Sequence, residues 1–116
     1  MDMIEILLFV KDFELGSKIS ERCVDQGRNV EFSDEKSDPA EFPDSVKLAI
    51  VDFDEDVFLS VGLVSGLKQR NLKIIGTMQR ISNNDQNKLR SAGCDIILTK
   101  SSIVKNLSNL FSEFLD

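Results

Sequence analysis

The feature that most constrains the fold of this chain is a regular alternation between short apolar runs and segments with helical periodicity. Five apolar runs have the length and composition of β-strands, and they lie at residues 4–10, 29–32, 46–51, 72–77 and 95–99. The connecting segments carry apolar residues three or four positions apart, as helices with one buried side do. Because parallel strands need crossover connections, the alternation predicts an α/β fold with a doubly wound, five-stranded parallel sheet. The exception is the acidic segment 33–45, where Pro39 and Pro43 predict a short or missing second helix.

Capping residues indicate where the helices begin and end. Asp12 is placed to cap the first helix, and Gly27 is placed to end it. After the third strand, helical periodicity begins at Phe58. Ser82 opens a sequence similar to a capping box, and Ser102 can cap the last helix. Helices are therefore expected in every connection except the one between the second and third strands.

Size and charge limit the class of protein. The length of 116 residues predicts one domain that spans residues 1–116. The longest apolar stretch, from Ile6 to Val10, is too short to cross a bilayer, and the N-terminus lacks the regions of a secretory signal. The formal net charge of −6, without a run of Lys or Arg, argues against nucleic acids and acidic membranes as partners. We therefore expect a cytoplasmic protein that binds neither nucleic acid nor membrane.

The sequence contains no histidine, which excludes imidazole catalysis, histidine metal ligands and phosphohistidine carriers. Cys23 and Cys94 stand among apolar neighbours without metal-ligand spacing, so they are expected to be core residues. Any chemistry must therefore come from carboxylates, hydroxyls and lysines. In a doubly wound sheet, ligands gather at the carboxyl ends of the strands. The residues that follow the strands are Lys11, Asp12, the acidic cluster from Asp52 to Asp56, Thr77 and Lys100.

These strand ends resemble the receiver domains of two-component response regulators, in order along the whole chain. Residues 92–100, Ala-Gly-Cys-Asp-Ile-Ile-Leu-Thr-Lys, are similar to the family's Ala-Gly-Ala-Asp-Asp-Tyr-Leu-Thr-Lys-Pro segment, which places Lys100 at the family's phosphate-sensing lysine. Residues 74–77 look like the strand that ends in the family's switch Thr or Ser, and residues 48–52 look like the strand that ends in the phospho-accepting aspartate. Residues 10–13 retain only the second member of the family's acidic pair. The resemblance implies a CheY-like (flavodoxin-like) sheet of strand order 2-1-3-4-5.

The resemblance also implies a function in phosphorelay signal transduction rather than an enzymatic activity. A histidine kinase or phosphotransfer protein would donate a phosphoryl group to Asp52, and a downstream protein would bind the changed surface. Thr77 would be the switch hydroxyl, and Lys100 would pair with the phosphate. A Mg²⁺ cofactor would screen the two anions that meet during transfer. Its protein ligands would be Asp12, Asp52 and the backbone carbonyl of Asp54.

Several residues depart from the pattern of the family. Lys11 stands where the first acidic residue of the pair is expected, and a positive charge there should weaken or abolish Mg²⁺ binding. Ile97 stands where the family often carries the aromatic residue that moves with the switch, and Ser101 replaces the usual proline. These changes affect the switch and leave the core intact. The alternative function is therefore a pseudo-receiver, a protein-interaction module that works without phosphorylation.

Simpler interpretations of the same residues are open at this point. Asp12 can be only a helix cap, and Asp52 and Lys100 can form a structural ion pair. Asp54 is the alternative phospho-acceptor, and Lys11 can occupy the place of the metal and neutralise the acidic cluster. A flavodoxin-type module on the same architecture is disfavoured because the segment after the first strand is bulky and carries carboxylates.

The last helix predicts a second kind of partner. Beside its core-facing stripe it carries Val104, Phe111 and Leu115. The face formed by the fifth strand and its neighbouring helices is the usual contact surface of the family that the chain resembles. A homodimer through this face is therefore a further prediction.

Overall fold

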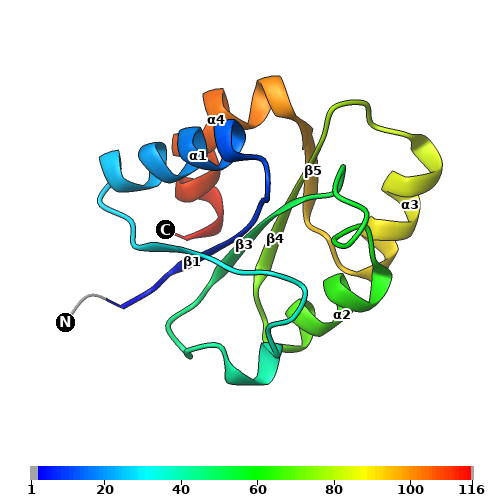
Figure 1. Ribbon diagram of the computed structural model, residues 1–116, viewed down its shortest axis with the longest axis horizontal. Helices are drawn as coiled ribbons and strands as arrows, with labels where there is room; N and C mark the ends of the chain where they lie inside the picture. The colour runs from blue at the N-terminus through cyan, green and yellow to red at the C-terminus, as the bar shows by residue number, and fades with distance from the viewer. Residues whose placement is uncertain (1–2, 116) are drawn as a thin grey trace.

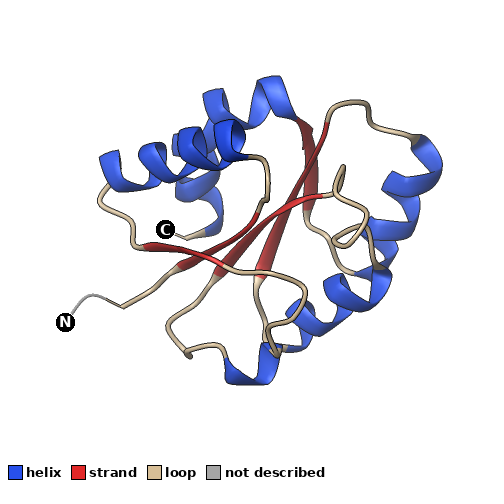
Figure 2. Cartoon of the chain, viewed as in Figure 1, coloured by secondary structure: helices blue, strands red, loops and turns tan. Residues whose placement is uncertain are grey.

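The computed structural model describes residues 3–115 and shows a five-stranded parallel sheet with helices on both faces (Figures 1 and 2). The strands are β1 (Ile6–Phe9), β2 (Val30–Phe32), β3 (Leu48–Asp52), β4 (Lys73–Met78) and β5 (Ile96–Thr99). The helices are α1 (Phe13–Asp25), α2 (Val61–Gln69), α3 (Asn83–Ala92) and α4 (Lys100–Phe114). The strand order is β2-β1-β3-β4-β5, and every neighbouring pair is parallel. The predicted fold class and strand order are confirmed.

The connection between β2 and β3 contains a single 3₁₀ turn, Pro39–Glu41, in place of an α-helix. The turn begins after Asp38, whose carboxylate accepts a hydrogen bond of 2.9 Å from the Ala40 N–H. This polar segment has no apolar stripe that a longer helix could bury against the sheet. The prediction of a short or missing second helix is confirmed, and the helix labelled α2 follows β3.

The sheet separates two hydrophobic layers, one under α1 and α4 and the other under α2 and α3 (Figure 1). Successive side chains of a strand point to opposite faces. In β1, Ile6 and Leu8 belong to the α1–α4 layer, whereas Leu7 and Phe9 belong to the α2–α3 layer. Full burial of one such side chain stabilises the fold by about 1.5–3 kcal/mol. Burial on both faces explains why this strand is a continuous apolar run in the sequence.

Both predicted ends of α1 are confirmed. The Asp12 carboxylate accepts a hydrogen bond of 3.0 Å from the Leu15 N–H. At the other end, Gly27 has a φ of +72°, the left-handed conformation that glycine adopts without strain. The Arg28 N–H then donates to the Cys23 carbonyl at 2.8 Å, which closes a Schellman motif.

The helix after β3 begins later than the sequence predicts. Phe58 lies in the loop before α2, and Ser60 caps the helix by accepting a hydrogen bond of 3.2 Å from the Leu63 N–H. Phe58 is fully buried, and its ring packs edge-on against Phe9 with 5.7 Å between centroids. Phe58 is therefore apolar because it packs under the loop. Its helical spacing from the apolar residues that follow does not mark the start of the helix.

The last helix begins earlier than the sequence predicts. Ser102 was expected to cap it, but α4 begins at Lys100, directly after β5, with Thr99 in the cap position. Ser102 belongs to the first turn of the helix, and its hydroxyl accepts a hydrogen bond of 2.9 Å from Thr99 Oγ1. The early start places Lys100 in the first turn of α4.

The surface of α4 also differs from the prediction. Phe111 is 2% exposed and belongs to the α1–α4 layer, with the Arg28 guanidinium 5.9 Å from its ring centroid. Val104 and Leu115 are partly buried against the same layer. Phe111 is therefore not part of an exposed dimer face, because the helix turns it toward the sheet; the homodimer itself stays a prediction. Within residues 3–115, none of the helices is long and apolar enough to cross a membrane.

Candidate functional site

The candidate site lies at the carboxyl edge of the sheet, where β3, β4 and β5 end. Asp52 is the last residue of β3 and pairs in register with Thr77 of β4. Lys100 follows β5 immediately. By the alternation of the strands, Asp52 and Thr77 share the face of Ile50 and Ile75, which belong to the α1–α4 layer. The structure thus brings the predicted acceptor, switch and lysine to one edge.

Asp52 is buried against a lysine and a backbone amide. Its side chain is 1% exposed, and Lys100 Nζ lies 3.4 Å from its Oδ2. The Asp54 N–H donates a hydrogen bond of 3.0 Å to Asp52 Oδ1. Oδ2 makes no hydrogen bond with any residue that the structure describes, so the Lys100 contact is its polar partner. The interpretation of Asp52 and Lys100 as an ion pair is consistent with these contacts.

The pKa values of Asp52 and Lys100 are both raised above those of the solvated side chains. Burial raises the pKa of Asp52, and the hydrogen bond from Asp54 and the charge of Lys100 oppose that rise only in part. Burial by itself would lower the pKa of Lys100, but the hydrogen bond to Asp54 and the charges of Asp52 and Asp54 outweigh it and raise the pKa. Lys100 therefore stays protonated at neutral pH, while Asp52 holds a proton more tightly than a solvated aspartate.

Asp54 has a role that the sequence did not predict. It was expected to offer its backbone carbonyl to a metal, but its carboxylate is the closer partner of Lys100, with 2.9 Å between Nζ and Oδ2. The same oxygen accepts a hydrogen bond of 2.8 Å from the Gln79 N–H, in the segment after β4. Because every residue except proline carries a backbone N–H, no sequence signal marks Gln79.

Phe53 and Gly76 fix the position of the turn that carries Asp52 and Asp54. Phe53 is 1% exposed, and its N–H donates a hydrogen bond of 2.9 Å to the Thr77 carbonyl of β4. A side chain at position 76 would overlap the Phe53 ring, so only glycine allows the ring to lie on β4 here. This packing holds the acidic turn against the end of β4.

Thr77 is fully buried, and its Oγ1 makes no hydrogen bond with any residue that the structure describes. Leaving a buried hydroxyl without a partner costs about 1–3 kcal/mol. Buried hydroxyls in folded proteins usually have a partner, so this one needs an explanation of its own. It sits in the position that the resemblance assigns to the switch.

The two polar residues after β1 have partners outside the cluster of Asp52, Asp54 and Lys100. Asp12 caps α1, as described above, and is exposed. Lys11 Nζ pairs with Glu35 at 3.1 Å and lies 5.7 Å from the Phe58 ring centroid. The alternative in which Lys11 neutralises the acidic cluster is therefore wrong, because Lys100 is the lysine that pairs with Asp52 and Asp54.

The predicted magnesium site combines two carboxylates with a backbone carbonyl, and each of these carboxylates has another contact in the structure. In residues 3–115, no three Asp, Glu or Cys side chains lie together in a group that could hold a metal. The Asp12 carboxylate accepts the helix-capping N–H of Leu15, and Lys100 lies against the carboxylates of Asp52 and Asp54. The ligand set inferred from the resemblance stays a prediction.

No protein family matches the sequence, and no curated protein is significantly similar to it. Solved structures, however, match its fold over nearly the whole chain. A CheY-like response regulator from Mesorhizobium loti superposes with a TM-score of 0.76 at 15% identity, covering 97% of this chain and 99% of that one. The chemotaxis protein CheY4 of Vibrio cholerae superposes with a TM-score of 0.78 at 16% identity, covering 97% and 98%.

The chain has the receiver-domain fold. A CheY-like receiver domain protein from Methanospirillum hungatei gives the same result, with a TM-score of 0.75 at 14% identity over 97% of this chain and 96% of the other. At such identities the receiver likeness establishes the architecture alone. The chemistry of this receiver-like domain must be argued from its own residues.

Proposed function

We propose that this chain is a receiver-like signalling domain, not an enzyme, that a partner protein recognises without phosphorylation of Asp52. The structures that share its fold include response regulators and a chemotaxis protein, which are signalling proteins by name. The observation that carries the proposal is the ion-pair cluster of Asp52, Asp54 and Lys100. Lys100 already contacts both carboxylates within the chain.

The limited access of a phosphodonor to Asp52 supports this proposal. A phosphodonor must reach a carboxylate oxygen of Asp52, and that side chain is 1% exposed. One of its oxygens accepts the Asp54 N–H, and the other lies next to Lys100. The negative charges of donor and acceptor would also repel each other wherever no cation screens them. Each of these features disfavours transfer while leaving the domain surface intact.

The test is the intact mass of the protein after incubation with Mg²⁺ and acetyl phosphate. We expect no phosphate-sized gain, either in the natural chain or in Asp52→Asn. A receiver domain of proven activity, treated in parallel, shows that the donor is competent. A phosphate-sized gain in the natural chain that Asp52→Asn lacks would contradict the proposal.

Phosphoryl acceptance on Asp52 is the second candidate function, and the buried hydroxyl of Thr77 favours it. An unsatisfied hydroxyl in register with the acceptor is a group that a phosphoryl oxygen could satisfy. On this function a histidine kinase or phosphotransfer protein is the donor, and Mg²⁺ is required despite Lys11. The mass gain would then disappear when EDTA removes Mg²⁺, and it would be reduced in Thr77→Val.

A further inference from the structure

The Asp54 carboxylate joins three segments that are far apart in the sequence. Asp54 lies in the turn after β3, Gln79 in the segment after β4, and Lys100 at the start of α4. Gln79 N–H and Lys100 Nζ both contact Asp54 Oδ2, at 2.8 Å and 2.9 Å. Its own N–H is held by Asp52 Oδ1 at 3.0 Å, so the residue is fixed through both its backbone and its side chain.

Another acidic residue of the same turn makes no comparable contacts. Asp56 is exposed, and its carboxylate forms neither a hydrogen bond nor an ion pair with residues 3–115. The Asp54 side chain retains only 31% exposure. Its contacts are therefore a property of this position and do not follow from a general attraction between acidic residues and Lys100.

We propose that Asp54 is a permanent internal latch, whose carboxylate takes the place of a phosphoryl group and holds the segment after β4 in one conformation. An anionic oxygen that accepts one ammonium and one backbone N–H is chemically the same kind of partner as a phosphoryl oxygen. In this domain the oxygen belongs to the chain itself, so the segment is held whether or not Asp52 is modified. The inference rests on the proposed phosphorylation-independent function and gives it a mechanism.

The buried Thr77 hydroxyl agrees with this mechanism. The latch contacts the backbone two residues after Thr77, at Gln79, and leaves Thr77 Oγ1 without a hydrogen bond. The segment after β4 is therefore held by its main chain, without any movement of the Thr77 side chain. The segment between β4 and α3 is then fixed by residues of the chain alone.

The experiment is amide hydrogen exchange at Gln79, followed by NMR on the full chain without any phosphodonor. The variants are Asp54→Ala, which removes the acceptor, Asp54→Asn, which removes only the charge, and the control Asp56→Ala from the same turn. Loss of a hydrogen bond to a charged group should speed Gln79 exchange by about tenfold or more in Asp54→Ala. Asp54→Asn should show a smaller acceleration because its amide oxygen can still accept, and Asp56→Ala should show none.

The proposal is overturned if Gln79 exchanges at the same rate in Asp54→Ala and Asp56→Ala while the β4 amides keep their protection. If Asp54→Ala does not fold, Asp54→Asn decides the question: the Lys100 Nζ and Gln79 N–H resonances must shift in it and must stay in place in Asp56→Asn. All of these measurements use unphosphorylated protein. A phosphate-sized mass gain on Asp52 would therefore refute the proposed function without deciding whether the latch exists.

Discussion

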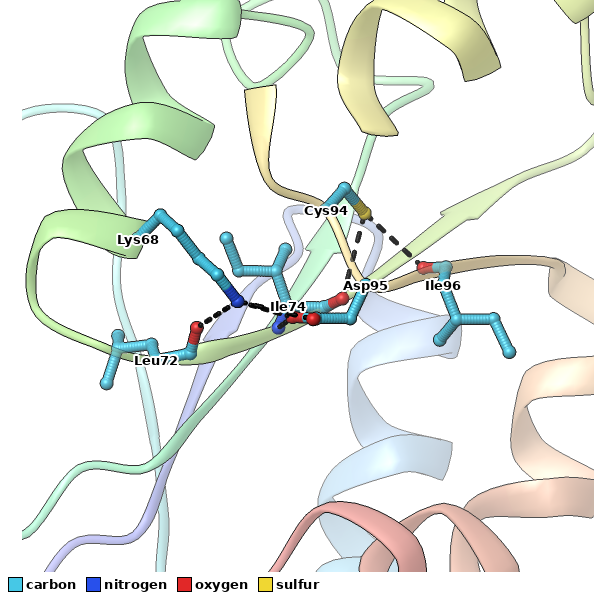
Figure 3. Close-up of polar contacts among 6 residues, drawn as sticks. All are labelled: Lys68, Leu72, Ile74, Cys94, Asp95 and Ile96. Carbon is cyan, nitrogen blue, oxygen red and sulfur yellow. Dashed lines mark hydrogen bonds and ion pairs between the residues drawn. The ribbon is translucent and has the colours of Figure 1, made fainter. Parts of the chain in front are cut away.

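Each edge of the sheet carries a lysine–aspartate ion pair, and the two pairs differ in how completely their polar atoms are satisfied. At the amino edge, both Asp95 carboxylate oxygens accept hydrogen bonds from Lys68, at 3.0 Å and 3.2 Å (Figure 3). Oδ2 also accepts the Ile74 N–H at 2.8 Å, and Lys68 donates further to the Leu72 carbonyl. This cluster ties α2, β4 and the start of β5 together. Each carboxylate oxygen in it has a hydrogen bond.

The carboxyl edge has three charged side chains in contact, and two of its buried polar atoms lack a hydrogen bond within the described residues. Asp52 is 1% exposed with an oxygen that lacks a hydrogen bond, and Thr77 beside it has an unsatisfied hydroxyl. The Asp95 side chain, by contrast, is 22% exposed, so water assists its solvation. Most buried polar groups in folded proteins have a hydrogen-bond partner, so each unsatisfied one needs its own explanation. The two edges therefore differ in how completely their buried polar groups are satisfied within residues 3–115.

The largest effect should come from breaking the amino-edge cluster. Asp95→Ala leaves Lys68 and the Ile74 N–H without their acceptor, which should lower the free energy of unfolding by about 2–3 kcal/mol. Urea unfolding at pH 7 measures the loss. Asp95→Asn should lose less because its amide oxygen can still accept the Ile74 N–H. A loss in Asp95→Ala no greater than that in Asp56→Ala would remove the distinction between the two edges.

Removing Lys100 should destabilise the carboxyl edge by about 2 kcal/mol at pH 7, because it leaves a charged Asp52 buried without its cation. The effect should shrink near pH 3.5, where Asp52 binds a proton and no longer needs the cation. Urea unfolding of Lys100→Ala at both pH values tests this, with Lys105→Ala, an exposed lysine of the same helix, as control. An equal cost at the two pH values would show that Asp52 and Lys100 are not coupled.

Asp52→Asn should change the free energy of unfolding by less than Lys100→Ala does, and in the opposite direction. Because burial raises the pKa of Asp52, the folded chain binds that proton more tightly than the unfolded chain does. Ionisation of Asp52 therefore lowers the stability of the natural chain as the pH rises from 3.8, the ordinary pKa of an aspartate, through the raised pKa of Asp52. Asp52→Asn lacks that decline and should be unchanged or up to about 1 kcal/mol more stable at pH 7. A clear destabilisation would mean that the charged carboxylate is a structural requirement.

The smallest effect should be seen in thiol reactivity. Burial raises the pKa of Cys94 to about 11 and that of Cys23 to about 12, so both thiols should resist alkylation at pH 8 in the folded chain. Cys94 lies beside the amino-edge cluster, with its Sγ 3.4 Å from the Ile96 carbonyl (Figure 3). Asp95→Ala should therefore speed labelling of Cys94 more than labelling of Cys23, as peptide mass analysis can show. Equal acceleration would indicate global rather than local opening.

Much of the fold could be predicted because its signals are local. The apolar runs of β1 and β3, the Asp12 cap and the Gly27 turn each depend on residues within a few positions. The start of α2 could not be predicted in the same way. The side chain of Phe58 is apolar because it packs on Phe9, 49 positions earlier in the chain, and periodicity cannot distinguish that from helix packing.

The sequence by itself determined the parallel sheet, the missing helix and the polar residues that follow each strand. It also determined that side-chain chemistry at the carboxyl edge must come from carboxylates, hydroxyls and lysines, since histidine is absent from the chain. Only the tertiary structure decided how these groups are paired. Asp54 shares Lys100 with Asp52 and binds Gln79, whereas Lys11 turns to Glu35. The physical reason is that hydrogen bonds and ion pairs form over about 3 Å, and the packing of distant segments decides which side chains come that close.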